Sequence, residues 1–125
     1  MSKSELSVEP VDACSPSQLE REPLGAESAV ELAAVFKALS DPVRLRLLSS
    51  IAARAGQEAC VCDLSAGIEL TQPTISHHLK VLRSAGLLTS ERRASWVYYR
   101  VVPEALRRLS DVLQAESGAP VEVCA

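Results

Sequence analysis

The spacing of apolar residues predicts helices over the first two thirds of the chain. Between residues 27 and 39, apolar side chains recur three or four positions apart, as on one face of a helix. A second helix is expected to begin after Asp41, which can cap it. Pro42 suits its first turn, where a missing N–H costs nothing. Gly56 is the expected end of this helix.

A short helix and a longer capped helix are predicted next. Gly67 limits the first to about two turns between residues 60 and 67. Thr71 can cap the second, which presents one apolar face and ends at Gly86. A short helix, a tight turn and a capped helix form a helix-turn-helix, whose second helix enters the major groove of DNA.

The apolar period then changes from about 3.6 to 2, which predicts strands. Residues 87–92 and 96–102 are two strand candidates around a polar turn, as in a β-hairpin. Alternation in the second strand places Tyr99 on the core side, whereas Trp96 and Tyr98 face the last helix or a partner. Pro103 begins that helix, which carries a leucine stripe. We therefore predict a mainly α fold with a β-hairpin wing, a winged helix-turn-helix.

Length and composition agree with one such domain. The chain has 125 residues, which suits a single domain. Residues 1–25 are rich in Ser, Pro and Glu and are expected to form a flexible arm. Residues 26–116 form the predicted domain, and residues 117–125 a tail. No apolar run approaches the roughly 18 residues of a membrane span, and no secretory signal is evident, so we expect a cytoplasmic protein.

The formal net charge of −3 hides a strong polarity along the chain. Residues 1–35 hold two basic and seven acidic side chains, a balance of −5, whereas residues 71–100 hold five basic and one acidic, a balance of +4. Such asymmetry is a hint of nucleic-acid binding, although a basic solvated helix face would give the same pattern.

The candidate DNA contacts lie on the second helix of the helix-turn-helix and at the hairpin tip. The outward face of that helix offers an amide, hydroxyls, an imidazole and an ammonium group, which can read bases or bind phosphates. Of the adjacent His77 and His78, one is expected outside and the other bonded locally. The candidates are Gln72, Thr74, Ser76, His77 and Lys80 on the helix, with Arg92 and Arg93 at the tip.

Two cysteines in the short-helix segment are the candidate metal ligands. Cys60 and Cys62 would lie about 200° apart on a continuous helix, so their sulfurs share no face there. They converge if Cys60 precedes the helix and Cys62 lies in its first turn. A helix N-terminus also favours the thiolate, which selects soft ions. The alternative is that both are buried structural cysteines. Asp63 is expected to cap or pair within the short helix rather than bind a soft ion.

Four blocks together resemble the ArsR/SmtB family of metalloregulatory repressors, and the arsenic-sensing type in particular. They are ALSDPVRLRLL at 38–48, EACVCDL at 58–64, TQPTISHHLKVLRSAGLL at 71–88 and RRASWVYYRV at 92–101. The resemblance implies a homodimeric repressor that binds double-stranded operator DNA and leaves it on binding a toxic metal or metalloid. Metal-sensing histidines are absent from the last helix, so a zinc site there is not expected.

The resemblance also implies a ligand set. Cys60 and Cys62 occupy the two cysteine positions of the family's sensor box, but Ser65 stands where arsenic sensors often carry a third cysteine. Relatives that sense cadmium or lead bring cysteines from the N-terminal arm, so Cys14 is the first choice for a third ligand and Cys124 the second. Three sulfurs suit As(III) or Sb(III), and four suit Cd(II) or Pb(II). Arsenite is the favoured inducer.

Two other functions are open to a thiol pair. A redox-sensing repressor would use a disulfide between Cys60 and Cys62, although a disulfide over one intervening residue is strained. A thiol enzyme, such as an arsenate-reducing protein with Cys60 as nucleophile, would need a phosphate-binding loop and an α/β pattern, and the sequence shows neither. We therefore expect no enzyme.

Overall fold

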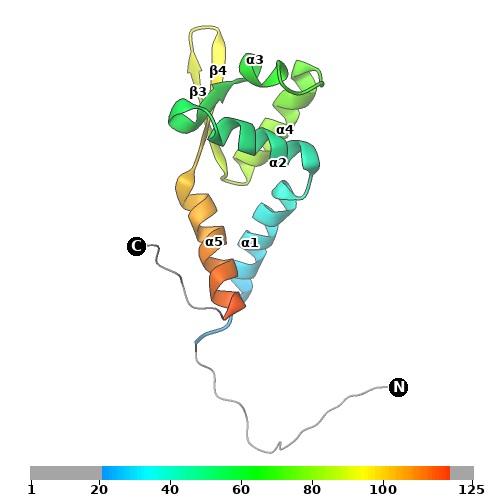
Figure 1. The fold of residues 1–125 in the computed structure, drawn as a ribbon. Coiled ribbons are helices and arrows are strands. Elements are labelled where there is room, and N and C mark those ends of the chain that lie inside the picture. The colour runs from blue at the N-terminus through cyan, green and yellow to red at the C-terminus, as the bar shows by residue number, and fades with distance from the viewer. Residues whose placement is uncertain (1–20, 119–125) are drawn as a thin grey trace, which may run out of the picture.

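The structure, a computed structural model, describes residues 21–118. A winged helix-turn-helix body contains α2, α3, α4 and a small sheet, and α1 and α5 extend from it towards the opposite end (Figure 1). The elements are α1 (Ala26–Leu39), α2 (Pro42–Ala52), the 3₁₀ turn η2 (Ala55–Gln57), β2 (Glu58–Cys60), α3 (Val61–Ser65), α4 (Gln72–Ser84), β3 (Leu88–Arg93), β4 (Trp96–Val101) and α5 (Pro103–Ser117).

The predicted hairpin is confirmed as β3 and β4, and a third strand joins it. The order in the antiparallel sheet is β2-β4-β3, so β4 lies in the middle. Within the β2–β4 ladder, Cys60 is opposite Tyr98 and Glu58 is opposite Arg100. The strand β2 was not predicted, and it places the segment that carries the cysteines directly beside the wing.

Local capping explains where the helices start. The Asp41 carboxylate accepts hydrogen bonds from the backbone N–H groups of Val43 and Arg44, which caps α2 as predicted. These bonds hold the pKa of Asp41 below its usual value. The Thr71 hydroxyl accepts from the N–H of Thr74 and caps α4 in the same way.

The predicted end of α2 at Gly56 is wrong by four residues. The helix stops at Ala52, and Gly56 lies in the 3₁₀ turn with a φ of 73°. This left-handed conformation suits glycine because glycine has no Cβ to collide with the backbone. The turn brings the chain from α2 into β2, and so it positions the cysteines.

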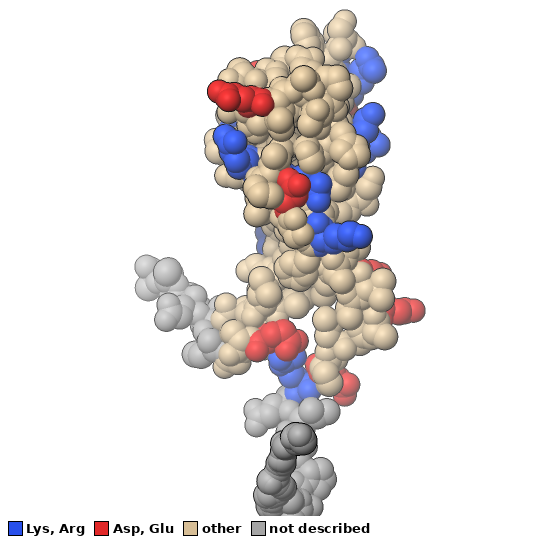
Figure 2. Space-filling view, turned by 90° about the vertical axis from the view of Figure 1, so that its right-hand side faces the viewer, with Lys and Arg blue, Asp and Glu red and all other residues tan. Residues whose placement is uncertain are grey.

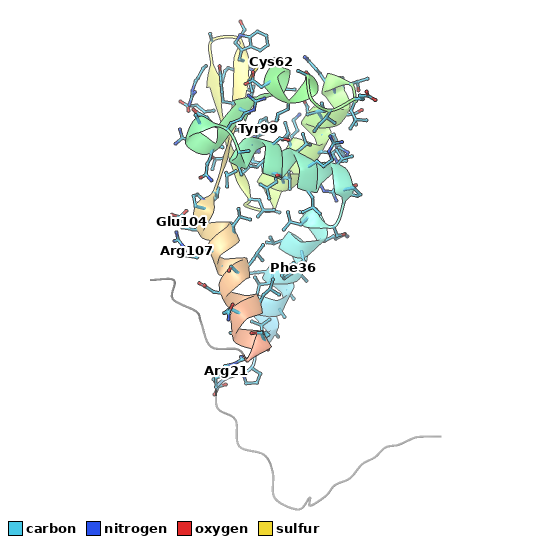
Figure 3. The ribbon with its side chains drawn as sticks, viewed as in Figure 1. Arg21, Phe36, Cys62, Tyr99, Glu104 and Arg107 are labelled. Atoms are coloured by element: carbon cyan, nitrogen blue, oxygen red, sulfur yellow. A yellow bond between two sulfur atoms is a disulfide. The ribbon has the colours of Figure 1, made fainter. Side chains whose placement is uncertain are left out.

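An aliphatic core holds α4 in place. Its inward residues Ile75, Leu79 and Leu82 are fully buried against Leu47 and Ile51 of α2. The inner face of β4 supplies Tyr99, which is buried as predicted (Figure 3). Because α4 is fixed through one face, its opposite face is left at the surface.

The helices α1 and α5 leave part of their apolar surface exposed. On α5 the predicted leucine stripe includes the buried Leu109, but Leu113 is 57% exposed. On α1, Val30 is 70% exposed, and Phe36 also reaches the surface. A groove of about 490 Å³ runs between α1, α5 and the end of α4. Within residues 21–118, no helix combines the length and the apolar character needed to cross a membrane.

Candidate thiol site and nucleic-acid interface

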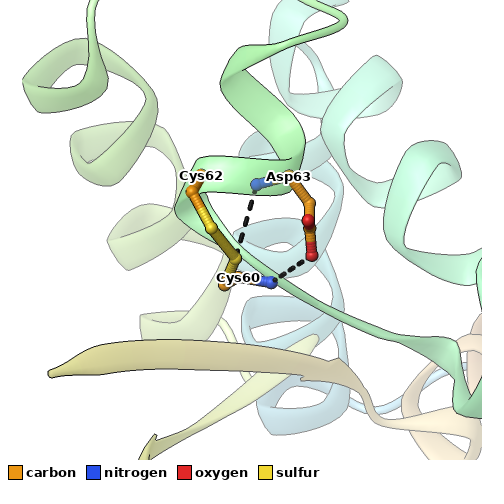
Figure 4. A group of neighbouring side chains, drawn as sticks. All are labelled: Cys60, Cys62 and Asp63. Carbon is orange, nitrogen blue, oxygen red and sulfur yellow. Dashed lines mark hydrogen bonds between the residues drawn. A yellow bond between two sulfur atoms is a disulfide. The ribbon is translucent and has the colours of Figure 1, made fainter. Parts of the chain in front are cut away.

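Cys60 and Cys62 meet at the start of α3. Cys60 is the last residue of β2 and the N-cap of α3, and Cys62 is the second residue of that helix. The two sulfurs were expected to converge only if Cys60 precedes the helix and Cys62 lies in its first turn, and the structure has this arrangement. The two sulfurs form a disulfide (Figure 4). Cys60 is buried and Cys62 is half-buried, so the pair lies at the edge of the core.

Asp63 completes a capping box around this pair. Its backbone N–H donates to Cys60 Sγ at 3.4 Å, and its carboxylate accepts from the Cys60 N–H at 3.3 Å. The sulfur and carboxylate ligand atoms of the three residues lie within 4.8 Å of one another. Because the carboxylate is used as a cap, the soft donors are the two sulfurs. They can bind an ion only as thiolates, which requires the dithiol form of the pair.

The two other cysteines, Cys14 and Cys124, lie outside the described residues.

The described chain begins at Arg21, whose guanidinium pairs with the Glu116 carboxylate at 3.0 Å and also donates to the carbonyl of Ala115. This pairing lowers the pKa of Glu116. Arg21 and Cys62 lie at opposite ends of the molecule (Figure 3).

The outer face of α4 presents most of the predicted DNA contacts. Gln72, Thr74, His77 and Lys80 are exposed, whereas Ser76 is half-buried. The hydroxyls of Thr74 and Thr71 lie 2.9 Å apart in a hydrogen bond, so Thr74 also takes part in the cap. His78, half-buried, bonds to Arg44 of α2, which agrees with the expected division between the two histidines.

The two arginines at the wing tip differ in their surroundings. Among residues 21–118, Arg92 has no hydrogen-bond or ion-pair partner, whereas Arg93 binds both carboxylate oxygens of Glu58, at 2.8 and 3.2 Å. Arg93 also pairs with Glu91 at 3.0 Å. These contacts raise the pKa of Arg93 and lower that of Glu58. Among the described residues, Arg92 therefore extends from the tip without a partner, whereas Arg93 is held by two carboxylates.

Glu58 is the residue at this site that sequence reasoning missed. Its carboxylate lies 3.3 Å from the Arg100 guanidinium as well, so it faces two arginines of the wing. The only local signal was its place two residues before Cys60. Its partners are 35 and 42 residues away in the sequence, so the pairing depends on the sheet.

Charge is distributed unevenly over the surface. On the face drawn in Figure 2, most Lys and Arg side chains lie on the winged body with some acidic side chains among them, whereas the end where α1 and α5 meet carries both acidic and basic side chains. Residues 71–100, which hold five basic side chains and one acidic side chain, lie in this body. A basic body with an exposed helix face can lie against a polyanion.

Comparison of the sequence with known proteins identifies one family of bacterial regulators. Residues 41–90 match the model of the bacterial regulatory protein, arsR family. An arsenic resistance transcriptional regulator from Pseudomonas putida is 51% identical over 88 residues, which cover 70% of this chain and 67% of the relative. A cadmium resistance transcriptional regulatory protein homologue from Staphylococcus aureus is 34% identical, covering 69% of each chain.

A solved structure agrees with the fold. The homodimeric winged helix-turn-helix DNA-binding domain of a possible ArsR-family transcriptional regulator from Mycobacterium bovis aligns with a TM-score of 0.60 at 28% identity. The alignment covers 86% of this chain and 94% of that one. The matched family and relatives are regulators of transcription, which sets aside the thiol enzyme.

Proposed function

The chain belongs to the ArsR family of bacterial regulatory proteins, and we propose that it is a dimeric repressor released from operator DNA by trivalent arsenic or antimony. The observation that carries this proposal is the meeting of Cys60 and Cys62 at the start of α3, the first helix of the helix-turn-helix. Such a repressor acts in the cytoplasm, where its operator is.

The inducer follows from the donor atoms. Cys60 and Cys62 lie side by side at the start of α3, so after reduction their two thiolates can bind one soft ion, whereas hard ions such as Mg²⁺ prefer oxygen. As(III) and Sb(III) bind three sulfurs in a pyramid. The relatedness to an arsenic resistance regulator supports arsenic as the inducer.

Cys14 of a second copy is our candidate for the third sulfur. Cys14 precedes Arg21 by seven residues, which reach about 25 Å when fully extended. From Arg21, the route to Cys60 follows the 15 residues of α5, about 22 Å. It then follows β4 back to Tyr98, roughly 13 Å more. This path is about 10 Å longer than the reach of Cys14, and Arg21 and Cys62 lie at opposite ends of the molecule (Figure 3). While Arg21 stays on Glu116, the proposal therefore takes this ligand from the partner chain of the dimer. The same reach argument applies to Cys124, the second choice.

The dimer is proposed to form through α1 and α5. Val30 and Leu113 would otherwise leave large apolar side chains in water, and burying each contributes roughly 1.5–3 kcal/mol. The homodimeric relative from Mycobacterium bovis supports this assembly. A dimer presents two α4 helices to successive major grooves.

The proposed DNA contacts are divided by their chemistry. Gln72 and His77 are placed to read base edges, Thr74 and Ser76 to bond bases or phosphates, and Lys80 to bind phosphate. Arg92 extends the contact from the wing. Arg93 can join it only by exchanging Glu58 for a phosphate.

The test is a fluorescence anisotropy titration of the reduced protein. The probe is a labelled duplex that the protein itself selects from a random library, titrated with and without arsenite. We expect arsenite to weaken DNA affinity by at least fivefold, the lower end of the usual range of allosteric coupling. An affinity unchanged by saturating arsenite contradicts the proposal.

The disulfide favours a second candidate, a thiol-redox-sensing repressor of the same fold. Here oxidation of Cys60 and Cys62 would replace metalloid binding as the signal. Loss of DNA binding with peroxide but not with arsenite would support it. Release by Cd(II) or Pb(II) alone would instead indicate the sensing type suggested by the cadmium-resistance relative.

A further inference from the structure

An ion pair between Glu58 and Arg93 spans the whole sheet. Glu58 is on β2 and Arg93 on β3, the two outer strands, and β4 lies between them. The two residues are also offset along β4, since Glu58 is opposite Arg100 and Arg93 is opposite Trp96. The contact is therefore made by long side chains that cross diagonally over the middle strand.

The side chain beneath this crossing is Tyr98. The Arg93 guanidinium carbon lies 4.5 Å from the centre of the Tyr98 ring, a cation–π contact. Tyr98 is in turn opposite Cys60 in the ladder. Cys60, Tyr98 and the ion pair thus lie on one face of the sheet, and Cys62 follows Cys60 at the start of α3.

Glu58 is much better enclosed than the other carboxylate that meets Arg93. The Glu58 side chain is 20% exposed and the Glu91 side chain 67%. Glu58 binds Arg93 through both oxygens and Arg100 through one. Bidentate arginine–carboxylate pairs fix direction as well as distance, so Glu58 is the stronger constraint on the wing.

We propose that Glu58 is a positioning residue through which the state of Cys60 and Cys62 sets the placement of the wing. This inference rests on the proposed function only for its effect on DNA. Glu58 and Cys60 are the two ends of a three-residue strand, so a rearrangement at the sulfurs moves Glu58 with them. Arg93 follows its carboxylate, and β3 follows Arg93.

A consequence for DNA binding is competition for one guanidinium. While Glu58 holds Arg93, that arginine makes no phosphate contact, and Arg92 alone extends from the tip. Release of Arg93 from Glu58 adds a phosphate contact, and each such contact steepens the dependence of log affinity on log salt by about 0.9.

The primary experiment is hydrogen exchange measured by mass spectrometry on the peptide covering residues 88–95. This peptide contains β3 and the turn, which do not pair with β2. The full chain is compared as disulfide, as dithiol and with arsenite added to the dithiol. We expect at least a threefold difference in exchange rate between states for the wild type, and for Glu58→Gln a difference at least three times smaller.

Glu91→Gln is the matched control. It removes the same charge from the same guanidinium but leaves the connection to β2 intact, so it should keep the wild-type difference. Arg93→Gln removes the same Glu58–Arg93 ion pair through the arginine, so it should reduce the difference in exchange rate as Glu58→Gln does. It also provides the test if Glu58→Gln does not fold. The inference is overturned if the wild type exchanges at the same rate in all three states. It is also overturned if Glu58→Gln and Arg93→Gln both keep the wild-type difference in exchange rate.

DNA binding supplies the second readout. For the selected duplex, Glu58→Gln should bind more tightly than wild type in the dithiol form, with a salt slope steeper by about 0.9. A purely structural loss would weaken binding and leave the slope unchanged or smaller, and that result counts against the inference. If arsenite never affects DNA affinity while the exchange differences persist, the proposed inducer fails and the role of Glu58 stands.

Discussion

The guanidinium of Arg44 lies 3.3 Å from Nδ1 of His78 and so joins α2 to α4. Arginine has no acceptor atom, so the ring nitrogen accepts this bond. Arg44 also donates to the carbonyl oxygens of Ala38 and Lys37 at the end of α1. One side chain thus ties the proposed recognition helix to two others.

His78→Lys should destabilise the fold, because it removes the acceptor and places a second positive charge beside Arg44. The expected loss in the free energy of unfolding is about 1–3 kcal/mol, measured by urea denaturation. His77→Lys is the control. His77 is exposed, so its replacement should change stability by less than about 0.5 kcal/mol. Equal losses in both variants would contradict this role for His78.

Asp41 should make stability fall in acid. Its pKa is lowered in the folded chain, first by the hydrogen bond from the Arg44 N–H. The charged form is therefore favoured by folding, so its contribution is complete above the ordinary pKa of 3.8 and is lost as the pH falls through the lower folded value. Asp41→Asn keeps a capping side chain but cannot titrate. Thermal melts from pH 7 to 2 should show a shallower decline for Asp41→Asn than for wild type.

Cys60→Ser should abolish the arsenite response without unfolding the protein. A serine hydroxyl can accept the Asp63 N–H bond that Cys60 Sγ accepts now, so the capping box survives. We expect DNA affinity within threefold of wild type and at least a tenfold loss of arsenite affinity, measured by the absorbance of the arsenic–thiolate bonds. Cys62→Ser should give the same result. A Cys60→Ser protein that still leaves DNA at the same arsenite concentration would exclude the pair as the sensor.

Arg92→Gln should weaken DNA binding in a sequence-independent way. A lone phosphate contact contributes about 0.9 to the salt slope, so the variant's slope should be shallower by that amount across duplexes of different sequence. Gln72→Ala should instead change the preference among bases and leave the slope alone. A change of preference in Arg92→Gln would mean that Arg92 reads bases.

Leu113→Glu should dissociate the dimer. The side chain is 57% exposed in the single chain and carries the apolar stripe of α5 outward. Sedimentation equilibrium should give monomers at concentrations where the wild type is dimeric. Leu45→Glu makes the same change at a leucine of α2 that is 49% exposed, and it should remain dimeric. Dimers in both variants would place the interface elsewhere.

Local signals predicted most of the helical framework. The caps at Asp41 and Thr71 and the prolines that follow depend on neighbours within three residues, so the sequence alone identifies them. The hairpin is also local, and its strands were found to within a residue.

Features set by distant residues were not predictable. The strand β2 has only three residues, too few to show an alternating pattern, and it forms because β4 offers it a free edge. For the same reason Arg93 was assigned to DNA without its tie to Glu58. The leucine stripe of α5 was predicted, but an apolar stripe does not show which of its residues the chain itself buries, and Leu113 is exposed.

The wing carries the only tryptophan of the chain, and Trp96 is 53% exposed there. Indole emission depends on the surrounding solvent, so all tryptophan fluorescence of this protein originates from one position two residues from Tyr98. Trp96 therefore serves as an intrinsic fluorescent probe of the wing. Its approach to a duplex can be timed in a stopped-flow instrument with no dye attached, separately from the arrival of α4 in the major groove.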